Sequence, residues 1–144
     1  MFETVEGSVA FDAEGRPAGE TKLREESCAE LDALAEGRRG EALACVERSG
    51  SCGNDAQAVA RAVDVIVHEA WHLRGVTSEA VTECSSLQTL AWTARRLGAT
   101  EAQGRGLARL QLETGYPLMP DRYRSGDCRD GGALDLRPGD PAWP

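Results

Sequence analysis

The chain has 144 residues, of which 41% are hydrophobic and 28% are charged, and its net charge is -8. This length allows one domain with one core, and the composition is that of a globular protein rather than of a disordered chain or a membrane span. The acidic balance argues against nucleic acid as a partner, because phosphate binding draws on Lys and Arg.

In the first third of the chain the sequence predicts one helix and at most a short strand pair. Residues 5–11 alternate weakly and "DAEGRPAGE" is a turn before "TKL", so we expect a short strand or a strand pair. A helix is predicted over residues 24–36, because its apolar positions have helical spacing and Gly37 follows. Residues 37–53, "GRRGEALACVERSGSCG", are expected to be mostly loop with one short helical turn.

The clearest helix is predicted over residues 54–74, where apolar residues recur at three-and-four spacing. Asn54 is a good N-cap residue, and Gly75 supplies the left-handed position that ends such a helix. Val76 can then pack back on the last turn. A strongly amphipathic helix of this kind places its polar stripe opposite the core.

Two more helices are expected after this one. Ser78 can cap a helix over residues 78–98, and "TEAQ" is a capping-box pattern that begins a helix over residues 100–115. The Pro, Gly and Asp content of residues 116–144 indicates ordered coil. The expected fold is mainly α with minor β.

We therefore predict a single domain over residues 1–144. It comprises a strand and loop region (1–23), a helical core (24–115) and a coil tail (116–144). Within the core, the helices before and after Gly75 should form an antiparallel helix-turn-helix hairpin.

Five cysteines lack the CxxC spacing of a cysteine zinc site. Cys45 and Cys52 can close a short disulfide loop, which requires an oxidising compartment. The start, "MFETVEGSVAFD", has no signal-peptide pattern. We expect a secreted or membrane-anchored protein whose signal or anchor has been removed, with a cytoplasmic location left open.

Both histidines of the chain lie in "HEAWH", residues 68–72. Residues four apart share one helix face, so the rings of His68 and His72 can point at one tetrahedral Zn²⁺ ion. Glu69, rotated by about 100°, can flank the metal without ligating it and take a proton from an activated water. The alternative is a pair of surface histidines on an ordinary helix.

A hydrolytic zinc site needs a third protein ligand. Glu79 and Glu83 lie one turn apart on the next helix, which passes back beside the histidines, and Glu79 is preferred over Glu83. Each has a simpler interpretation, as an acid at a helix N-terminus or an acid facing solvent.

Four other residues are weaker candidates near this site. Asp64 can accept from a ligand imidazole, although a surface acid is the simpler interpretation. Tyr116 and Tyr123 are the phenols available to stabilise an oxyanion, or they pack the tail. Met119 can lie below the metal, although "PLMP" lacks the rest of such a motif.

"HEAWH" resembles the zinc-binding helix of the zincin metallopeptidases. That resemblance implies that His68 and His72 ligate zinc and that Glu69 is the general base. "EAVTEC" is similar to the "ExxAD" segment of gluzincins, which implies that Glu79 is the third ligand and Glu83 the acid behind it. Residues 45–138 also resemble a group of uncharacterised zincin-like proteins of high-GC bacteria, which are often exported or anchored.

The function expected from these residues is that of a small zinc-dependent metallopeptidase, which hydrolyses peptide bonds of a peptide or protein substrate. The first alternative is a non-catalytic binding or structural module that holds zinc on a zincin scaffold. The second is a disulfide-stabilised helical interaction domain without a metal.

Overall fold

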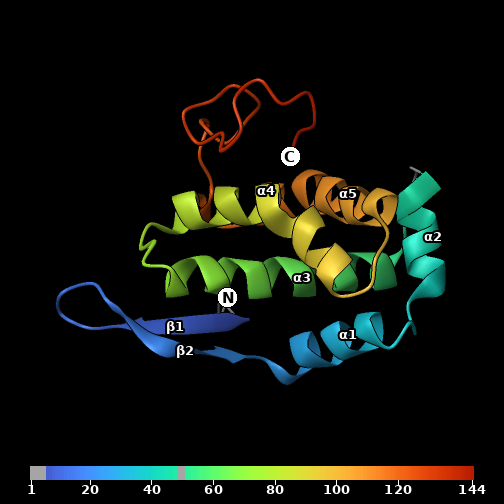
Figure 1. Cartoon of the computed structure of the whole chain (residues 1–144), viewed down its shortest axis with the longest axis horizontal. Coiled ribbons are helices and arrows are strands. Elements are labelled where there is room, and N and C mark those ends of the chain that lie inside the picture. The colour runs from blue at the N-terminus through green and yellow to red at the C-terminus, as the bar shows by residue number, and fades with distance from the viewer. Residues whose placement is uncertain (1–5, 49–50) are drawn as a thin grey trace.

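The computed structural model describes residues 6–48 and 51–144, and its fold is mainly α with a small two-stranded sheet (Figure 1). Val5, the first residue of the expected strand, lies outside the described residues. The elements in chain order are β1 (Gly7–Phe11), β2 (Pro17–Leu23), α1 (Glu25–Ala35), α2 (Gly40–Arg48), α3 (Asn54–Leu73), α4 (Glu79–Arg96) and α5 (Glu101–Leu110).

The two strands form an antiparallel hairpin in which Gly7 pairs with Leu23 and Val9 pairs with Thr21. Its turn is held by the carboxylate of Asp12, which accepts from the backbone N–H groups of Glu14 and Arg16 at 3.0 and 2.9 Å. The expected strand pair is therefore present. Both strands pack against α3.

Helix α3 is the central element of the fold. The strand hairpin and α1 lie along one side of it, and α4 and α5 lie along the other (Figure 1). Val59, Ala60 and Val63 in its apolar stripe are fully buried, whereas Ala70 near its C-terminal end is exposed. The expected N-cap is wrong: Asn54 is the first helical residue, and Gly53 occupies the cap position without a side-chain bond.

Residues 37–53 differ from the sequence-based expectation of a loop. Helix α2 takes up Gly40–Arg48 and buries Ala42, Leu43 and Val46 in the core. Those three positions fall at i, i+1 and i+4, which is enough for one narrow apolar face. Burial against α3 and α5 stabilises a nine-residue helix that local propensity alone would leave marginal.

A glycine turn joins α3 to α4 as expected. Gly75 has a φ of +97°, the left-handed conformation that favours glycine. The backbone N–H of Val76 then donates to the carbonyl of Trp71 at 3.2 Å. The side chain of Ser78 caps α4 by accepting from the N–H of Val81 at 3.4 Å.

Helix α5 has the expected capping box between Thr100 and Gln103. It packs closely on α4, where a Cβ on Gly104 would approach the carbonyl oxygen of Ala91 to 2.7 Å. The helix widens into a π-helical turn over Gln111–Gly115. Short 3₁₀ turns follow at Tyr116–Leu118 and Asp121–Tyr123.

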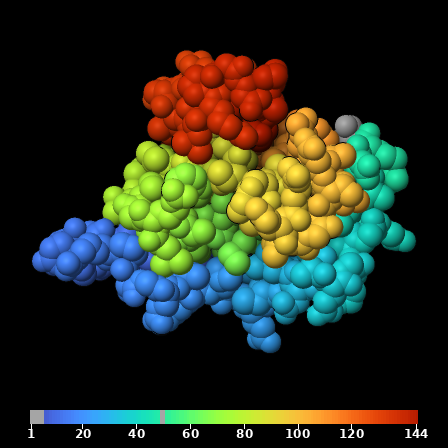
Figure 2. Space-filling view, viewed as in Figure 1, coloured from blue at the N-terminus to red at the C-terminus, as the bar shows by residue number. Residues whose placement is uncertain are grey.

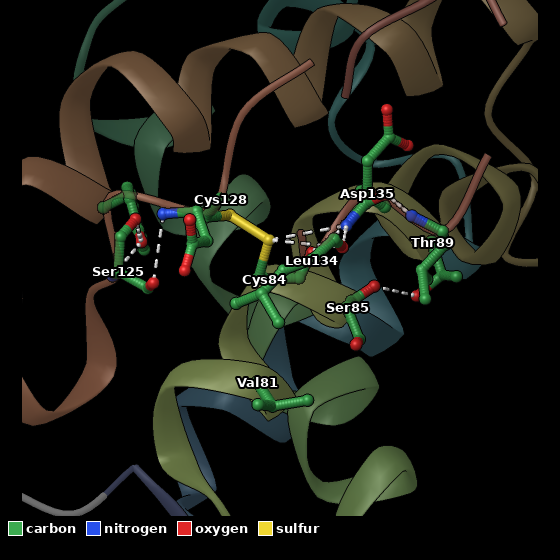
Figure 3. Close-up of a disulfide and its surroundings, with 12 residues drawn as sticks. Val81, Cys84, Ser85, Thr89, Ser125, Cys128, Leu134 and Asp135 are labelled. Carbon is green, nitrogen blue, oxygen red and sulfur yellow. Dashed lines mark hydrogen bonds between the residues drawn. A yellow bond between two sulfur atoms is a disulfide. The ribbon is translucent and has the colours of Figure 1, made fainter. Parts of the chain in front are cut away.

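The rest of the C-terminal segment is irregular and forms a cap on α4 (Figure 2). A disulfide joins Cys128 in this segment to Cys84 in α4 (Figure 3). Gln88 adds a two-sided clamp, because its Nε2 donates to the carbonyl of Leu134 at 2.9 Å and its Oε1 accepts from the N–H of Leu136 at 2.7 Å.

The expected disulfide between Cys45 and Cys52 is also present, although the two residues at the tip of its loop lie outside the described residues. Cys28 is a free, exposed thiol. Two disulfides indicate an oxidising environment. Among the described residues, no helix combines the length and the apolar character needed to cross a membrane.

Candidate metal centre

Three side chains converge between α3 and α4. Nε2 of His68 lies 2.9 Å from Oε2 of Glu79, and Nε2 of His72 lies 3.2 Å from the same oxygen. One ligand atom from each residue falls within 4.8 Å of the other two. Both histidines are buried, whereas the Glu79 side chain is 35% exposed and borders solvent. These three residues can hold a metal ion.

The opposite ring nitrogens have their own partners. Nδ1 of His72 lies 2.7 Å from the carbonyl oxygen of Val76, and Nδ1 of His68 lies 2.8 Å from Oε2 of Glu83. A carbonyl oxygen only accepts, so Nδ1 of His72 carries a proton. An ionised Glu83 fixes the same tautomer on His68. In both neutral rings the lone pair is then on Nε2 and points toward Glu79.

This arrangement is chemically matched to a cation. When both rings are neutral, two imidazole lone pairs and one carboxylate oxygen face one another, and none of these three groups is a hydrogen-bond donor. A single positive ion would satisfy all three groups. A bond from the second ring nitrogen to a carboxylate or a backbone carbonyl is the usual support of a metal-ligating histidine.

Glu83 is buried and linked to a second carboxyl group, Asp64. Asp64 accepts from the hydroxyl of Ser86 at 2.6 Å and from the amide of Gln111 at 2.9 Å. Burial, followed by the charge of Glu83, raises the pKa of Asp64 well above its usual range. Burial also raises the pKa of Glu83. The interaction between the two groups raises the pKa of Asp64 and lowers that of Glu83, so of the two carboxyl groups Asp64 more readily holds a proton.

The structure corrects the expected position of Asp64. It is 2% exposed rather than a surface acid, and its carboxyl group accepts from Ser86 and Gln111 instead of from an imidazole. Sequence reasoning also missed Ser86 and Gln111, which complete this network from α4 and from the π-helical turn. The polar residue at position 111, within an otherwise apolar stripe, was the available signal.

Glu69 lies beside the ligand group and is 4% exposed. Its Oε2 is buried and has no hydrogen-bond partner among the described residues. Burial raises the pKa of this carboxyl group. The β1 backbone approaches so closely that a Cβ on Gly7 would lie 2.7 Å from Oε1 of Glu69. A side chain at position 7 would therefore force the Glu69 carboxylate to move.

Of the two tyrosines, Tyr123 is at the site, with its ring centroid 5.8 Å from that of His68. Tyr116 instead holds the C-terminal segment, because its hydroxyl accepts from the N–H of Ser125 at 2.9 Å. Met119 lines a cavity next to His68 and Glu69. The rings of Phe11 and His72 lie nearly perpendicular to each other, with 5.6 Å between their centroids.

No family model matches the chain, and neither a curated protein nor a solved structure does so. The interpretation of the site therefore depends on its own geometry.

Proposed function

We propose that the protein is a zinc-dependent metallopeptidase in which His68, His72 and Glu79 ligate the metal and Glu69 is the general base. The observation that carries this proposal is the buried, unpartnered oxygen of Glu69 next to the ligand group. A purely structural metal site has no need of such a group, and leaving a buried carboxylate oxygen unpaired costs free energy.

Zinc fits this donor set, because two imidazoles and one carboxylate are the ligands of many catalytic zinc sites with one position left open. When bound, a zinc ion polarises the peptide carbonyl and lowers the pKa of water. Glu69 takes a proton from the attacking water as the new C–O bond forms. It then gives this proton to the leaving nitrogen as the C–N bond breaks, which returns the carboxylate to its starting state.

The strand hairpin supports a peptide substrate. The N–H of Arg24 donates to the carbonyl of Glu6 across the hairpin. In an antiparallel pair, hydrogen-bonded and non-hydrogen-bonded positions alternate along the strand, so the N–H and C=O of Gly7, the residue after Glu6, point away from β2. No third strand pairs with β1 among the described residues. An extended peptide can add to this edge and bring its scissile bond to Glu69.

Replacing Glu69 with Gln tests the proposal. The isosteric amide cannot act as a base, so we expect Glu69→Gln to keep its zinc and to lose cleavage of a peptide library by 100-fold or more. Glu41→Gln, at an exposed acid in α2, is the matched control and should cleave normally. A zinc-loaded wild type that cleaves no peptide would favour the non-catalytic zinc module instead.

We also propose that the protein works outside the cytoplasm, because both disulfides require an oxidising environment. Thiol counting on protein taken directly from its source should then find one free thiol per chain, that of Cys28. Five free thiols would contradict this location.

A further inference from the structure

A cavity of about 310 Å³ begins at His68 and Glu69 and extends along α3 away from Glu79. One wall is the α3 surface, including Val65 and Arg61. The start of β1 borders it with Gly7, and the opposite wall comes from the segment between α5 and the C-terminal cap. This volume is at the lower limit for ligand pockets, which suits one side chain better than a large ligand.

The opposite wall ends in an apolar lip formed by Leu118, Met119 and Pro120. Leu118 is 86% exposed, which is the largest exposed fraction among the three exposed large hydrophobic residues in the part of the chain that the structure describes. The other two are Trp92 and Leu136, and neither lines the cavity. An apolar side chain lying against the lip would remove Leu118 from water, which is favourable in proportion to the area covered.

Oε2 of Glu69 and Oε1 of Glu83, at the end of the cavity next to the ligand group, have no hydrogen-bond partner among the described residues, whereas other polar groups along the walls are paired within the protein. Asp64 and Gln111, deep in the wall, bond to each other at 2.9 Å. Arg61 contacts Glu6 at 3.5 Å at the outer end. The carboxylates of Glu6 and Glu69 would repel an acidic side chain, and that of Glu6 remains when Glu69 is replaced by Gln, so the charges on the walls act against Asp or Glu in the substrate.

We propose that this cavity receives one apolar, uncharged substrate side chain next to the scissile bond, and that Leu118 and Met119 select it. The inference rests on the proposed peptidase function, because the peptide must lie over Glu69 for its side chain to reach the lip.

Binding of peptides to zinc-loaded Glu69→Gln protein tests the selection without turnover. The probes are three labelled peptides of one length that differ only in a central Leu, Asp or Lys, followed by fluorescence anisotropy. We expect the Leu peptide to bind at least ten-fold tighter than the Asp peptide, and also tighter than the Lys peptide, because contact with the apolar lip would strip the lysine ammonium group of its hydration. Equal binding, tighter binding of the Lys or Asp peptide, or no binding of any peptide would overturn the proposal.

Leu118→Asp, made in the same background, should remove the preference for Leu, and Met119→Ala should weaken it. Leu136→Asp changes another exposed leucine, on the C-terminal cap, and is the matched control. Because Leu118 is so exposed, its replacement should leave thermal unfolding unchanged. Equal Leu preferences in the Leu118→Asp and Leu136→Asp proteins would show that the lip does not select the substrate.

Failure of this inference can be told from failure of the proposed function. In the first outcome the wild type cleaves the Leu, Asp and Lys peptides equally well. The peptidase proposal would then hold, and the proposed selection by the cavity would be wrong. In the second outcome the wild type prefers the Leu peptide, the Leu118→Asp substitution removes that preference, and no peptide is cleaved. The cavity would then be a recognition site, and the peptidase proposal would be wrong.

Discussion

The α3–α4 hairpin and the C-terminal segment, residues 116–144, both border the candidate site, but they are held in different ways. The hairpin is fixed by backbone bonds within its helices, by the Gly75 turn and by side chains buried between α3 and α4. The C-terminal segment has only short 3₁₀ turns and is fixed by Cys128 and the Gln88 clamp.

This difference separates metal binding from contact with a substrate. The hairpin carries every residue of the ligand group, so metal binding should depend on the hairpin alone. The segment that leads into the cap contributes Tyr123 and the apolar lip, which face the space a substrate would enter. Variants of the hairpin should therefore affect the metal, whereas variants of the cap should affect stability and substrate.

The largest effect is expected from His72→Ala. Removing one of two imidazoles should reduce zinc from about one ion per chain to none at micromolar protein, because zinc affinity requires the full donor set. Plasma mass spectrometry of the purified protein measures this. A strong chelator should lower the melting temperature of the wild type but not of the variant, by linkage. Full zinc content in His72→Ala would mean that the ion binds elsewhere.

The two disulfides give the next effect. Replacing Cys84 and Cys128 by Ser opens a loop that spans 44 residues in sequence, against 7 for Cys45 and Cys52. Chain entropy predicts losses of about 4 and about 2.5 kcal/mol in the free energy of unfolding. Urea unfolding of the two double variants measures both. Zinc should remain bound to the folded Cys84/Cys128 variant, and its loss would show that the cap helps to hold the ligands.

The smallest effect is expected from Glu83→Gln. The amide oxygen can still accept from Nδ1 of His68, but without a charge, so zinc affinity should fall by about 10 to 100-fold rather than vanish. Competition with a fluorescent zinc chelator measures the affinity. Glu113→Gln, at an exposed acid in the π-helical turn, is the control. A loss as complete as that in His72→Ala would instead make Glu83 a ligand.

The sequence predicted the hairpin well, because its signals are local: the "HEAWH" spacing, Gly75 and the Ser78 cap all act within one or two helical turns. It ranked Glu79 above Glu83 as the third ligand. The geometry favours that order, since Oε2 of Glu79 faces both Nε2 atoms, but it remains a prediction until a metal is measured.

What the sequence could not predict depends on distant contacts. Asp64 became a buried acid because Ser86 and Gln111 reach it from two other parts of the chain. The partner of Cys84 lies 44 residues away, and no local pattern marks that pairing. Helix α2 was missed because its stability comes from burial against α3 and α5 rather than from its own residues.

Because both histidines lie in the candidate metal centre, their imidazole signals report on that centre alone. Every imidazole signal in the protein's nuclear magnetic resonance spectrum comes from His68 or His72. Their Nδ1 protons, shielded from solvent by Glu83 and Val76, should exchange slowly enough to be seen. Titrating metal into the protein while recording these two rings would therefore report each step of site assembly without any label on the rest of the chain.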